Sequence, residues 1–245
     1  MTKKKIIFIT GSSSGIGFGL AKNFFDLGFE VIINSNNINN LKRASKLLNN
    51  CKYFFGDLTN KRSLKKIFNQ IKKEYKKIDF LVCNYGNSNF KKNHLDFEHA
   101  FKNNFFTTVN TISLALPILK KDKSKIICIS SICGVEVIKN SPLGYSIAKS
   151  AVNNYVKGLS CILSENGISI NAIVPGNVMF EGSLWDKKIK NNPARVKKYI
   201  KENVPMNKFG SLDDIFNMCD FIFSKSSNFV TGSTFIIDGG QTKKF

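Results

Sequence analysis

The loop Thr10-Gly11-Ser12-Ser13-Ser14-Gly15-Ile16-Gly17 joins an apolar run, Lys5–Thr10, to an amphipathic helical pattern, Gly15–Leu27. Glycine has no Cβ atom, so glycines at this spacing let the backbone turn sharply and approach a pyrophosphate closely. The first turn of the helix then directs free N–H groups and the positive end of its dipole at the phosphates. The loop lacks the Lys-Ser/Thr ending of loops that hydrolyse nucleoside triphosphates. We therefore expect it to bind a dinucleotide through Gly11, Ser13, Ser14, Gly15, Ile16 and Gly17.

Short apolar runs and longer helical patterns alternate along the rest of the chain. Several of these runs are apolar without alternation, which is typical of strands buried on both faces of a parallel sheet. Strands are predicted for Lys5–Thr10, Glu30–Asn34, Lys52–Phe55, Phe80–Asn84, Lys125–Ser130, Ser169–Pro175 and Thr234–Asp238. Helices are predicted for Gly15–Leu27, Ile38–Leu48, Lys61–Tyr75, Phe97–Leu119, Tyr145–Glu165 and Leu212–Phe223, with Thr59 as the N-cap of the third.

This order predicts right-handed crossover connections and an α/β fold, a doubly wound parallel sheet of about seven strands with helices on both faces (Rossmann fold). The length suits a single domain over residues 1–245. One stretch, 176–210, breaks the alternation and contains Trp185, the only tryptophan. An insertion of this length predicts a substrate lid over 177–210, although an ordinary surface excursion would give the same pattern.

The formal net charge of +20 raises the question of a nucleic-acid partner. The lysines are scattered, however, and the sequence has no zinc-finger spacing and no RNP-like aromatic motif, so we expect none. No apolar run approaches the ~20 residues that span a bilayer, and the first run ends too early for a signal peptide. We therefore expect a cytoplasmic protein with no membrane partner.

The cysteines and histidines do not have the spacing of metal ligands. The six cysteines form no CxxC pair, and only two histidines are present. A metal site is therefore not expected. Most of the cysteines lie in apolar surroundings, which is typical of small core residues in a reducing compartment.

Further motifs follow in order along the chain. They are Asn84-Tyr85-Gly86, Asn104, Ser130-Ser131-Ile132-Cys133-Gly134, Tyr145-Ser146-Ile147-Ala148-Lys149, Pro175-Gly176, Thr231-Gly232 and Asp238-Gly239-Gly240. With the glycine loop, they resemble the motifs of the short-chain dehydrogenase/reductase family, with Tyr85 in place of the alanine of the NAG motif. The length is similar to the single-domain branch typified by 3-oxoacyl-acyl-carrier-protein reductases. The resemblance implies an NAD(P)(H)-dependent oxidoreductase that interconverts a ketone and a secondary alcohol.

Four residues are candidates for catalysis: Asn104, Ser131, Tyr145 and Lys149. The pKa of a free tyrosine, about 10, is too high for a base at neutral pH. Lys149 follows Tyr145 by one helical turn, so its charge is expected to lower the pKa of Tyr145. Ser131 can donate a hydrogen bond to the substrate carbonyl as negative charge develops there. The resemblance implies that Lys149 also binds the nicotinamide ribose and that Asn104 holds a water behind it.

The resemblance also covers the rest of the cofactor site. It implies that Asp57 and Leu58 contact the adenine, although an aspartate that caps the next helix is the alternative. Asn84 and Gly86 are expected on the ribose side, with Tyr145 and Lys149. Pro175, Gly176 and Val178 complete the expected cofactor contacts.

The residues after the second strand bear on the choice of cofactor. NAD-binding enzymes commonly hold the ribose 2′-hydroxyl with an acidic residue there. The stretch Ile33–Asn37 has no carboxylate, and the arginine that NADP enzymes of the family often have at Asn36 is also absent. Ser14, Ser35 and Asn36 can bind a 2′-phosphate, with Lys42 or Arg43 in reach. We therefore expect NADP(H) to be favoured over NAD(H).

The substrate pocket is expected between Ser131, Tyr145, the loop 135–144, Asn87–Phe90 and the segment after Gly176. Phe180 and Trp185 are expected to form an aromatic wall of the lid. Two small-molecule substrates remain open: a 3-oxoacyl thioester, and a sugar-like ketone or alcohol of surface-glycan biosynthesis, whose reductases Gly176–Trp185 resembles. A non-catalytic dinucleotide-binding sensor is a third alternative, although such proteins typically lose the tyrosine or the lysine.

Two of the predicted helices, Phe97–Leu119 and Tyr145–Glu165, have more apolar residues than one buried face needs. These residues include Phe101, Phe105, Phe106, Val152, Tyr155, Val156 and Leu159. Because the family resemblance also implies pairing of these helices, we expect a homotetramer or homodimer. The alternative is that an AT-rich genome has placed extra Phe and Ile on the surface.

Overall fold

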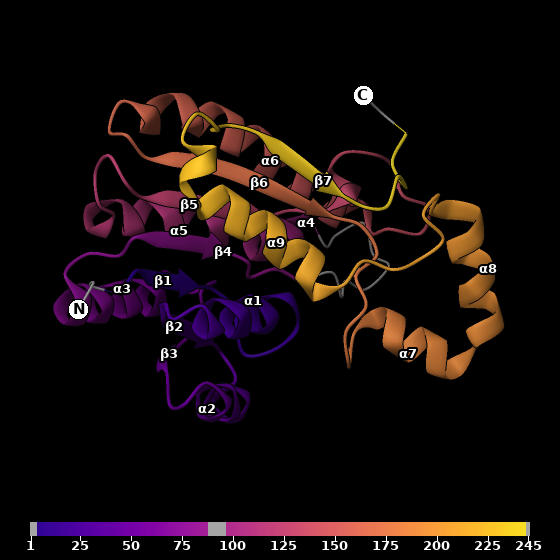
Figure 1. Ribbon diagram of the computed structural model, residues 1–245, viewed down its shortest axis with the longest axis horizontal. Helices are drawn as coiled ribbons and strands as arrows, with labels where there is room; N and C mark the ends of the chain where they lie inside the picture. The colour runs from indigo at the N-terminus through magenta and orange to yellow at the C-terminus, as the bar shows by residue number, and fades with distance from the viewer. Residues whose placement is uncertain (1–3, 88–96, 244–245) are drawn as a thin grey trace.

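The computed structural model describes residues 4–87 and 97–243. In these ranges the chain forms a seven-stranded parallel sheet in the order β3-β2-β1-β4-β5-β6-β7 (Figure 1). The strands are β1 (Ile6–Ile9), β2 (Glu30–Ser35), β3 (Lys52–Phe55), β4 (Phe80–Cys83), β5 (Lys125–Ile129), β6 (Ser169–Pro175) and β7 (Thr234–Ile237). The predicted doubly wound sheet is confirmed, and each predicted strand end lies within one residue of the observed end.

Helices cover both faces of the sheet (Figure 1). Successive strand residues point to opposite faces, so β1 contributes Ile6 and Phe8 to one core and Ile7 and Ile9 to the other. The first core is covered by α3 (Lys61–Tyr75), α5 (Thr107–Ala115) and α6 (Leu143–Ser164). The second is covered by α1 (Gly15–Asp26), α2 (Ile38–Leu47) and α9 (Leu212–Phe223). Burial on both faces explains why the inner strands, such as β1, β4 and β5, are apolar without alternation.

The strand order reverses at β1, which pairs with β2 on one side and with β4 on the other. In open α/β sheets, ligands bind at the carboxyl ends of the strands at such a point. The loops after β1 and β4 meet here. The backbone N–H of Thr10 donates to the carbonyl of Val82 (3.0 Å), and that of Asn84 donates to the hydroxyl of Thr10 (3.0 Å). The fold therefore joins the glycine loop to the Asn84-Tyr85-Gly86 motif.

The long helix predicted for Phe97–Leu119 is not uniform. It consists of α4 (Phe97–Phe101), a π-helical segment (Lys102–Phe106), α5 and a 3₁₀ turn (Leu116–Ile118). The wider π turn is often found at functional sites. Here both neighbouring residues Asn103 and Asn104 are buried.

The segment 176–210 contains two helices that the sequence did not predict, α7 (Leu184–Asn191) and α8 (Pro193–Asn203). Figure 1 shows them at one end of the molecule, beyond the arrowhead of β7. The prediction of Thr59 as the N-cap of α3 is wrong. Helix α3 begins at Lys61, so the preceding residue, Asn60, occupies the cap and accepts the N–H groups of Arg62 and Ser63.

Among residues 4–87 and 97–243, no helix combines the length and apolar character needed to cross a membrane. The same ranges contain no group of three or more side chains suited to hold a metal ion.

Candidate active site

The glycine loop has the backbone shape that its glycines allow. Gly11 and Gly15 both have a φ of 60°, in the left-handed region that favours glycine. A Cβ atom on Gly17 would lie 2.4 Å from Nδ2 of Asn84 and 2.6 Å from the carbonyl oxygen of Gly11. The glycine loop and Asn84 therefore pack closely against the start of α1, and a side chain at Gly17 would displace them.

Helix α1 begins without a side-chain cap. Ser14 occupies the N-cap position and makes no cap hydrogen bond, whereas Asn37 and Asn60 cap α2 and α3. The N–H groups of the first turn are therefore not used by a cap, and they lie at the positive end of the helix dipole. Ser13 is buried, Ser14 is exposed and Ile16 is half-buried. This loop fits the pyrophosphate of a dinucleotide.

The side chain of Asn84, in the loop after β4, forms hydrogen bonds with the glycine loop. Its Nδ2 donates to the carbonyls of Thr10 and Gly11, at 3.0 Å each.

Asp57 does not cap α3. Its carboxylate accepts the backbone N–H (2.8 Å) and the hydroxyl (2.9 Å) of Thr59, and so shapes the turn after β3. The side chain of Leu58 is buried in the core, so an adenine contact there would use its backbone.

Tyr85 makes a contact that sequence reasoning missed. Its hydroxyl donates to Oδ1 of Asn103 (3.0 Å), and Nδ2 of Asn103 donates to the carbonyl of His99 (2.8 Å). These bonds link the loop after β4 to the π-helical segment. A large polar aromatic residue where the family has alanine was the signal that could have predicted a partner.

Ser131 and Tyr145 meet where the end of β5 faces the first turns of α6. A side-chain hydrogen bond joins them, and Oγ of Ser131 also accepts the N–H of Cys133 (3.2 Å). Nζ of Lys149 lies 5.8 Å from the ring centroid of Tyr145 and donates to the carbonyl of Ile129 (2.8 Å). The structure therefore brings the predicted serine, tyrosine and lysine together.

The protonation states differ from the expectation that Lys149 lowers the pKa of Tyr145. Burial raises the pKa of Tyr145 to about 12, against the lowering effect of its hydrogen bond with Ser131. Burial also lowers the pKa of Lys149 to about 8. In the chain alone, desolvation of the phenolate therefore determines the direction of the shift. Tyr145 is protonated at neutral pH, which is the state of a proton donor.

Asn104 is fully buried and holds the loop after β4. Its Oδ1 accepts the N–H of Asn87 (3.0 Å), and its Nδ2 donates to the carbonyls of Asn87 and Ala100 (3.0 Å each). A Cβ atom on Gly86 would lie 2.8 Å from Oδ1 of Asn104 and 3.2 Å from Nζ of Lys149. Gly86 therefore permits Asn104 and Lys149 to approach the same loop.

A cavity of about 570 Å³ opens beside Ser131 and Tyr145. The loop Ile138–Pro142 forms part of its wall, and Trp185 lines it together with residues of α7 and α8. Helices α7 and α8 therefore lie where the lid was expected. Asn87 is not among the residues that line this cavity, and residues 88–90, also expected in the wall, lie outside the described residues.

Phe180 lies elsewhere. It is not among the lining residues, and its ring packs against the core between the sheet and α1. A Cβ atom on Gly15 would lie 3.3 Å from that ring, so Phe180 borders the glycine loop. Val178 is buried and pairs with Gly210, while a Cβ on Gly176 would lie 2.7 Å from Cβ of Asp238. The segment after β6 is therefore held close to the end of β7.

Comparison with known proteins gives a consistent result. The chain matches the family model described as enoyl-(acyl carrier protein) reductase over residues 11–242. It is 28% identical to 3-oxoacyl-[acyl-carrier-protein] reductase FabG of Buchnera aphidicola, over 97% of each chain. It is 30% identical to the FabG of Rickettsia bellii, over 95% of each chain. L-sorbose reductase of Gluconobacter frateurii, solved with NADPH and L-sorbose, superposes with a TM-score of 0.90 at 23% identity, over 99% of this chain and 98% of that one. This chain belongs to the short-chain dehydrogenase/reductase family of NAD(P)(H)-dependent oxidoreductases.

Proposed function

We propose that this protein reduces a ketone to a secondary alcohol with NADPH, and that Tyr145 donates the proton. The observation that carries this proposal is the joint placement of Ser131 and Tyr145 on the wall of the large cavity, with Lys149 behind them. A non-catalytic sensor is disfavoured because the tyrosine and the lysine are both present and both lie at the cavity end of α6.

The side chains have complementary tasks. The hydroxyl of Ser131 donates a hydrogen bond to the substrate carbonyl oxygen as negative charge develops there. Tyr145, protonated at neutral pH, donates its proton to the same oxygen. The ammonium group of Lys149 stabilises the phenolate left behind, and Asn104 fixes the loop against which Lys149 lies. When bound, the dihydronicotinamide supplies the hydride that attacks the carbonyl carbon.

Two substrate classes have support. The FabG relatives act, by their names, on a 3-oxoacyl group carried by acyl carrier protein. The solved neighbour from Gluconobacter holds a sugar, L-sorbose. Four asparagines line the cavity, Asn140, Asn177, Asn191 and Asn192. An asparagine side chain can both donate to and accept from hydroxyl groups. This lining favours the sugar-like substrate.

The activity is tested by following NADPH absorbance with a panel of ketoses, sugar acids and 3-oxoacyl thioesters. We expect oxidation of NADPH with at least one ketose or sugar acid. A protein that binds NADPH but reduces nothing on this panel would contradict the proposed reductase activity.

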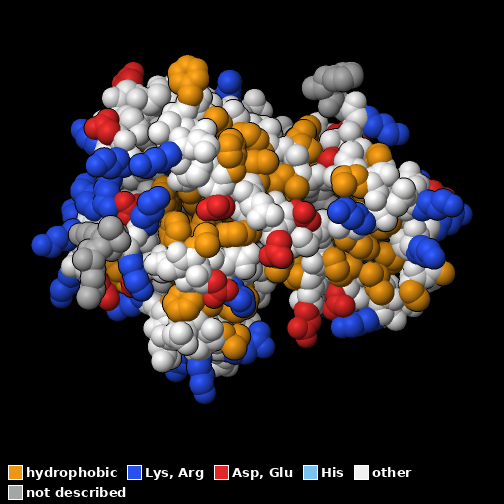
Figure 2. All heavy atoms as spheres, in the orientation of Figure 1, with side chains coloured by type: hydrophobic (Ala, Val, Ile, Leu, Met, Phe, Trp, Pro, Cys, Tyr) orange, Lys and Arg blue, Asp and Glu red, His pale blue; other side chains and the backbone are white. Residues whose placement is uncertain are grey.

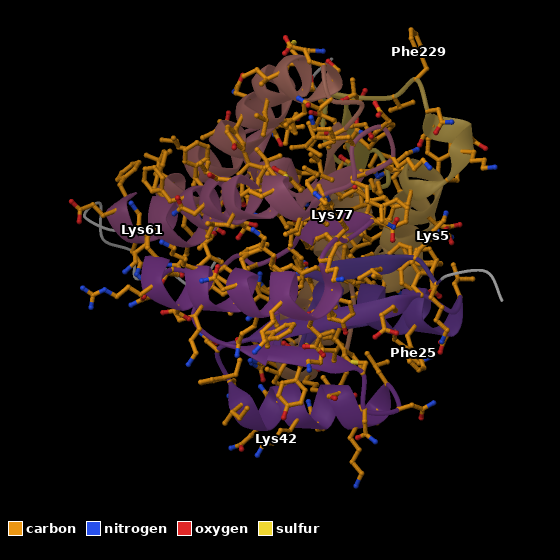
Figure 3. All side chains as sticks on the ribbon, turned by 90° about the vertical axis from the view of Figure 1, so that its left-hand side faces the viewer. Lys5, Phe25, Lys42, Lys61, Lys77 and Phe229 are labelled. Carbon is orange, nitrogen blue, oxygen red and sulfur yellow. The ribbon has the colours of Figure 1, made fainter. Side chains whose placement is uncertain are left out.

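We propose that NADPH binds more tightly than NADH. Residues 34–43 contain no carboxylate to bind a ribose 2′-hydroxyl or to repel a phosphate. Asn36 is exposed, and so are two cations of α2, Arg43 and Lys42. Figure 3 shows Lys42 on α2. We expect NADPH to bind about tenfold more tightly, the effect of one charge-assisted hydrogen bond. Fluorescence titration with both cofactors measures this ratio.

The variant Asn36→Asp tests the cause of that preference. The new carboxylate can accept the ribose hydroxyl and repels a 2′-phosphate, so the ratio should reverse. Tighter binding of NADH by the unmodified protein would show that the stretch after β2 recognises the unphosphorylated ribose.

We propose a homotetramer or homodimer built on α4, α5 and α6. Two of the residues expected in the interface, Val152 and Val156, are buried in the core and cannot contribute, because their side of α6 faces the sheet. Phe106 and Ile162, however, are 51% and 62% exposed. The rings of Phe105 and Phe106 are 5.4 Å apart, and Phe105 meets Tyr155 of α6 at 5.9 Å. This leaves an aromatic face between the helices that a second copy would cover.

Sedimentation at micromolar concentration tests the assembly. We expect a dimer or tetramer for the unmodified protein and a monomer for Phe106→Asp. The matched variant Leu47→Asp places the same charge on an exposed apolar residue of α2 and should leave the assembly intact. A monomeric unmodified protein, or equal dissociation by both variants, would contradict the interface.

A cytoplasmic location is proposed as well, since all six cysteines are free thiols.

A further inference from the structure

Three cationic side chains line the cavity beside Tyr145. They come from three segments: Lys139 from the loop before α6, Lys188 from α7 and Arg195 from α8. As far as the described residues extend, no aspartate or glutamate lines the cavity with them. Figure 2 shows apolar side chains gathered over α7 and α8, with Lys and Arg side chains around them. The cavity therefore carries an uncompensated positive charge.

Nearby acidic groups are engaged elsewhere. The ion pairs within residues 4–87 and 97–243 involve none of the three cations. The carboxylate of Asp186 binds Lys190 and the N–H of Gly182, at 2.9 Å each. The carboxylate of Glu136 accepts the N–H of Lys243 (2.6 Å). The cations of the cavity are thus available for an anion that comes from outside the chain.

The start of α8 adds to this positive field. Asn191, Asn192, Arg195 and Val196 line the cavity, so the first turn of the helix borders it. Asn192 is the N-cap, and its side chain accepts the N–H of Arg195 (3.0 Å). The positive end of the dipole of α8 therefore lies at the part of the wall that Arg195 lines. Lys188 lies in the last turn of α7, where it offsets the negative end of that helix.

The remaining lining suits a hydroxylated molecule. Trp185 packs against Tyr199 with ring centroids 4.9 Å apart and tilted rings, and Nζ of Lys188 lies 4.3 Å from the centroid of the Trp185 ring. The hydroxyl of Tyr199 accepts from Nε2 of Gln241 (3.1 Å), and Oε1 of Gln241 accepts from Nδ2 of Asn177 (2.7 Å). This chain of hydrogen bonds fixes Tyr199 and Asn177 on the cavity wall and ties α8 to the end of the sheet.

We propose that the substrate is an anionic, hydroxylated ketone or alcohol, a sugar acid or a sugar phosphate. Arg195, Lys188 and Lys139 hold its anionic group, while its carbonyl carbon lies next to Ser131 and Tyr145. Carboxylate and phosphate share the chemistry that a guanidinium recognises by paired hydrogen bonds. This proposal rests on the proposed reductase function and specifies its substrate class.

Binding is measured by the fluorescence of Trp185, the only tryptophan, in protein saturated with NADP⁺. The probes are D-fructose, D-fructose 6-phosphate and 5-keto-D-gluconate, so the phosphate and carboxylate arms are separate. We expect at least one anionic probe to bind at least about tenfold more tightly than D-fructose, the effect of one charge-assisted hydrogen bond. The preference should fall as ionic strength rises.

Two variants of α8 separate the effect of a cation in the cavity on binding from the effect of the net charge of the protein. Arg195→Gln removes a cation that lines the cavity, and Lys197→Gln removes an exposed cation of the same helix that does not. Arg195→Gln should abolish most of the preference for the anionic probe, and Lys197→Gln should keep it.

Equal binding of all three probes, absence of binding by the anionic ones, or equal effects of the two variants would each overturn the anion site. Tight binding of acetoacetyl-coenzyme A that does not depend on Arg195 would also overturn it. The reductase function is tested separately, since reduction of neutral ketones by NADPH would survive the loss of this site.

Discussion

Replacing Tyr145 by Phe is expected to lower kcat about 10²–10⁴-fold, the range that one general acid contributes. The substitution removes the hydroxyl that is hydrogen-bonded to Ser131 and leaves the ring in place. Initial rates of NADPH oxidation with a substrate found on the panel measure the loss, and NADPH titration should show nearly unchanged cofactor binding.

Tyr155→Phe is the matched control. Tyr155 lies on the same helix, and burial raises its pKa to about 12 as it does for Tyr145. Its ring packs against Phe105, away from the cavity lining. This variant should retain activity within a few-fold. If Tyr145→Phe kept the turnover of the unmodified protein, the assignment of the proton donor would be wrong.

Gly17→Ala is expected to weaken NADPH binding about 10- to 100-fold, because the cost of inserting a methyl group into a packed site is typically about 1–3 kcal/mol. The added Cβ would approach Nδ2 of Asn84 to 2.4 Å and the carbonyl of Gly11 to 2.6 Å. Either Asn84 loses its hydrogen bonds to the loop or the loop moves away from the helix start. Both changes disturb the N–H groups that are proposed to bind the pyrophosphate. Fluorescence titration gives the Kd, and circular dichroism shows whether the variant is folded.

Gly158→Ala separates this steric effect from the general effect of alanine in a helix. Gly158 lies in α6, and a Cβ there would meet nothing within 4 Å. The substitution should raise the stability by about 0.5–1 kcal/mol and leave the Kd for NADPH unchanged. A folded Gly17→Ala protein with the Kd of the unmodified protein would contradict the proposed phosphate loop.

The sequence by itself determined the strands, most helices and the identity of the motif residues. Strands such as Ser169–Pro175 and helices such as Lys61–Tyr75 agree at both ends with the structure. The reason is local. Apolar runs without alternation require burial on both faces, and the glycines of the first loop require backbone shapes that other residues rarely adopt. The spacing of Tyr145 and Lys149 likewise places both on one face of any helix that contains them.

Other features depend on partners that are distant in the sequence. The π turn at Asn103 and Asn104 forms hydrogen bonds with Tyr85 and Asn87 of the loop after β4. No local sequence pattern predicts this turn. Phe180 borders Gly15 because its ring packs into the core beside α1, although its position after β6 suggested the substrate side.

Tertiary structure also determines that the pKa of Tyr145 is raised and not lowered. Sequence spacing shows that Lys149 is near, but only packing determines how much water the phenol loses and that the ammonium group points to the carbonyl of Ile129. In the same way, α7 and α8 bring Lys188 and Arg195 to the cavity of Tyr145 across more than 40 residues of chain. Desolvation and long-range contact are properties of the assembled molecule, because each depends on every element packed around the group.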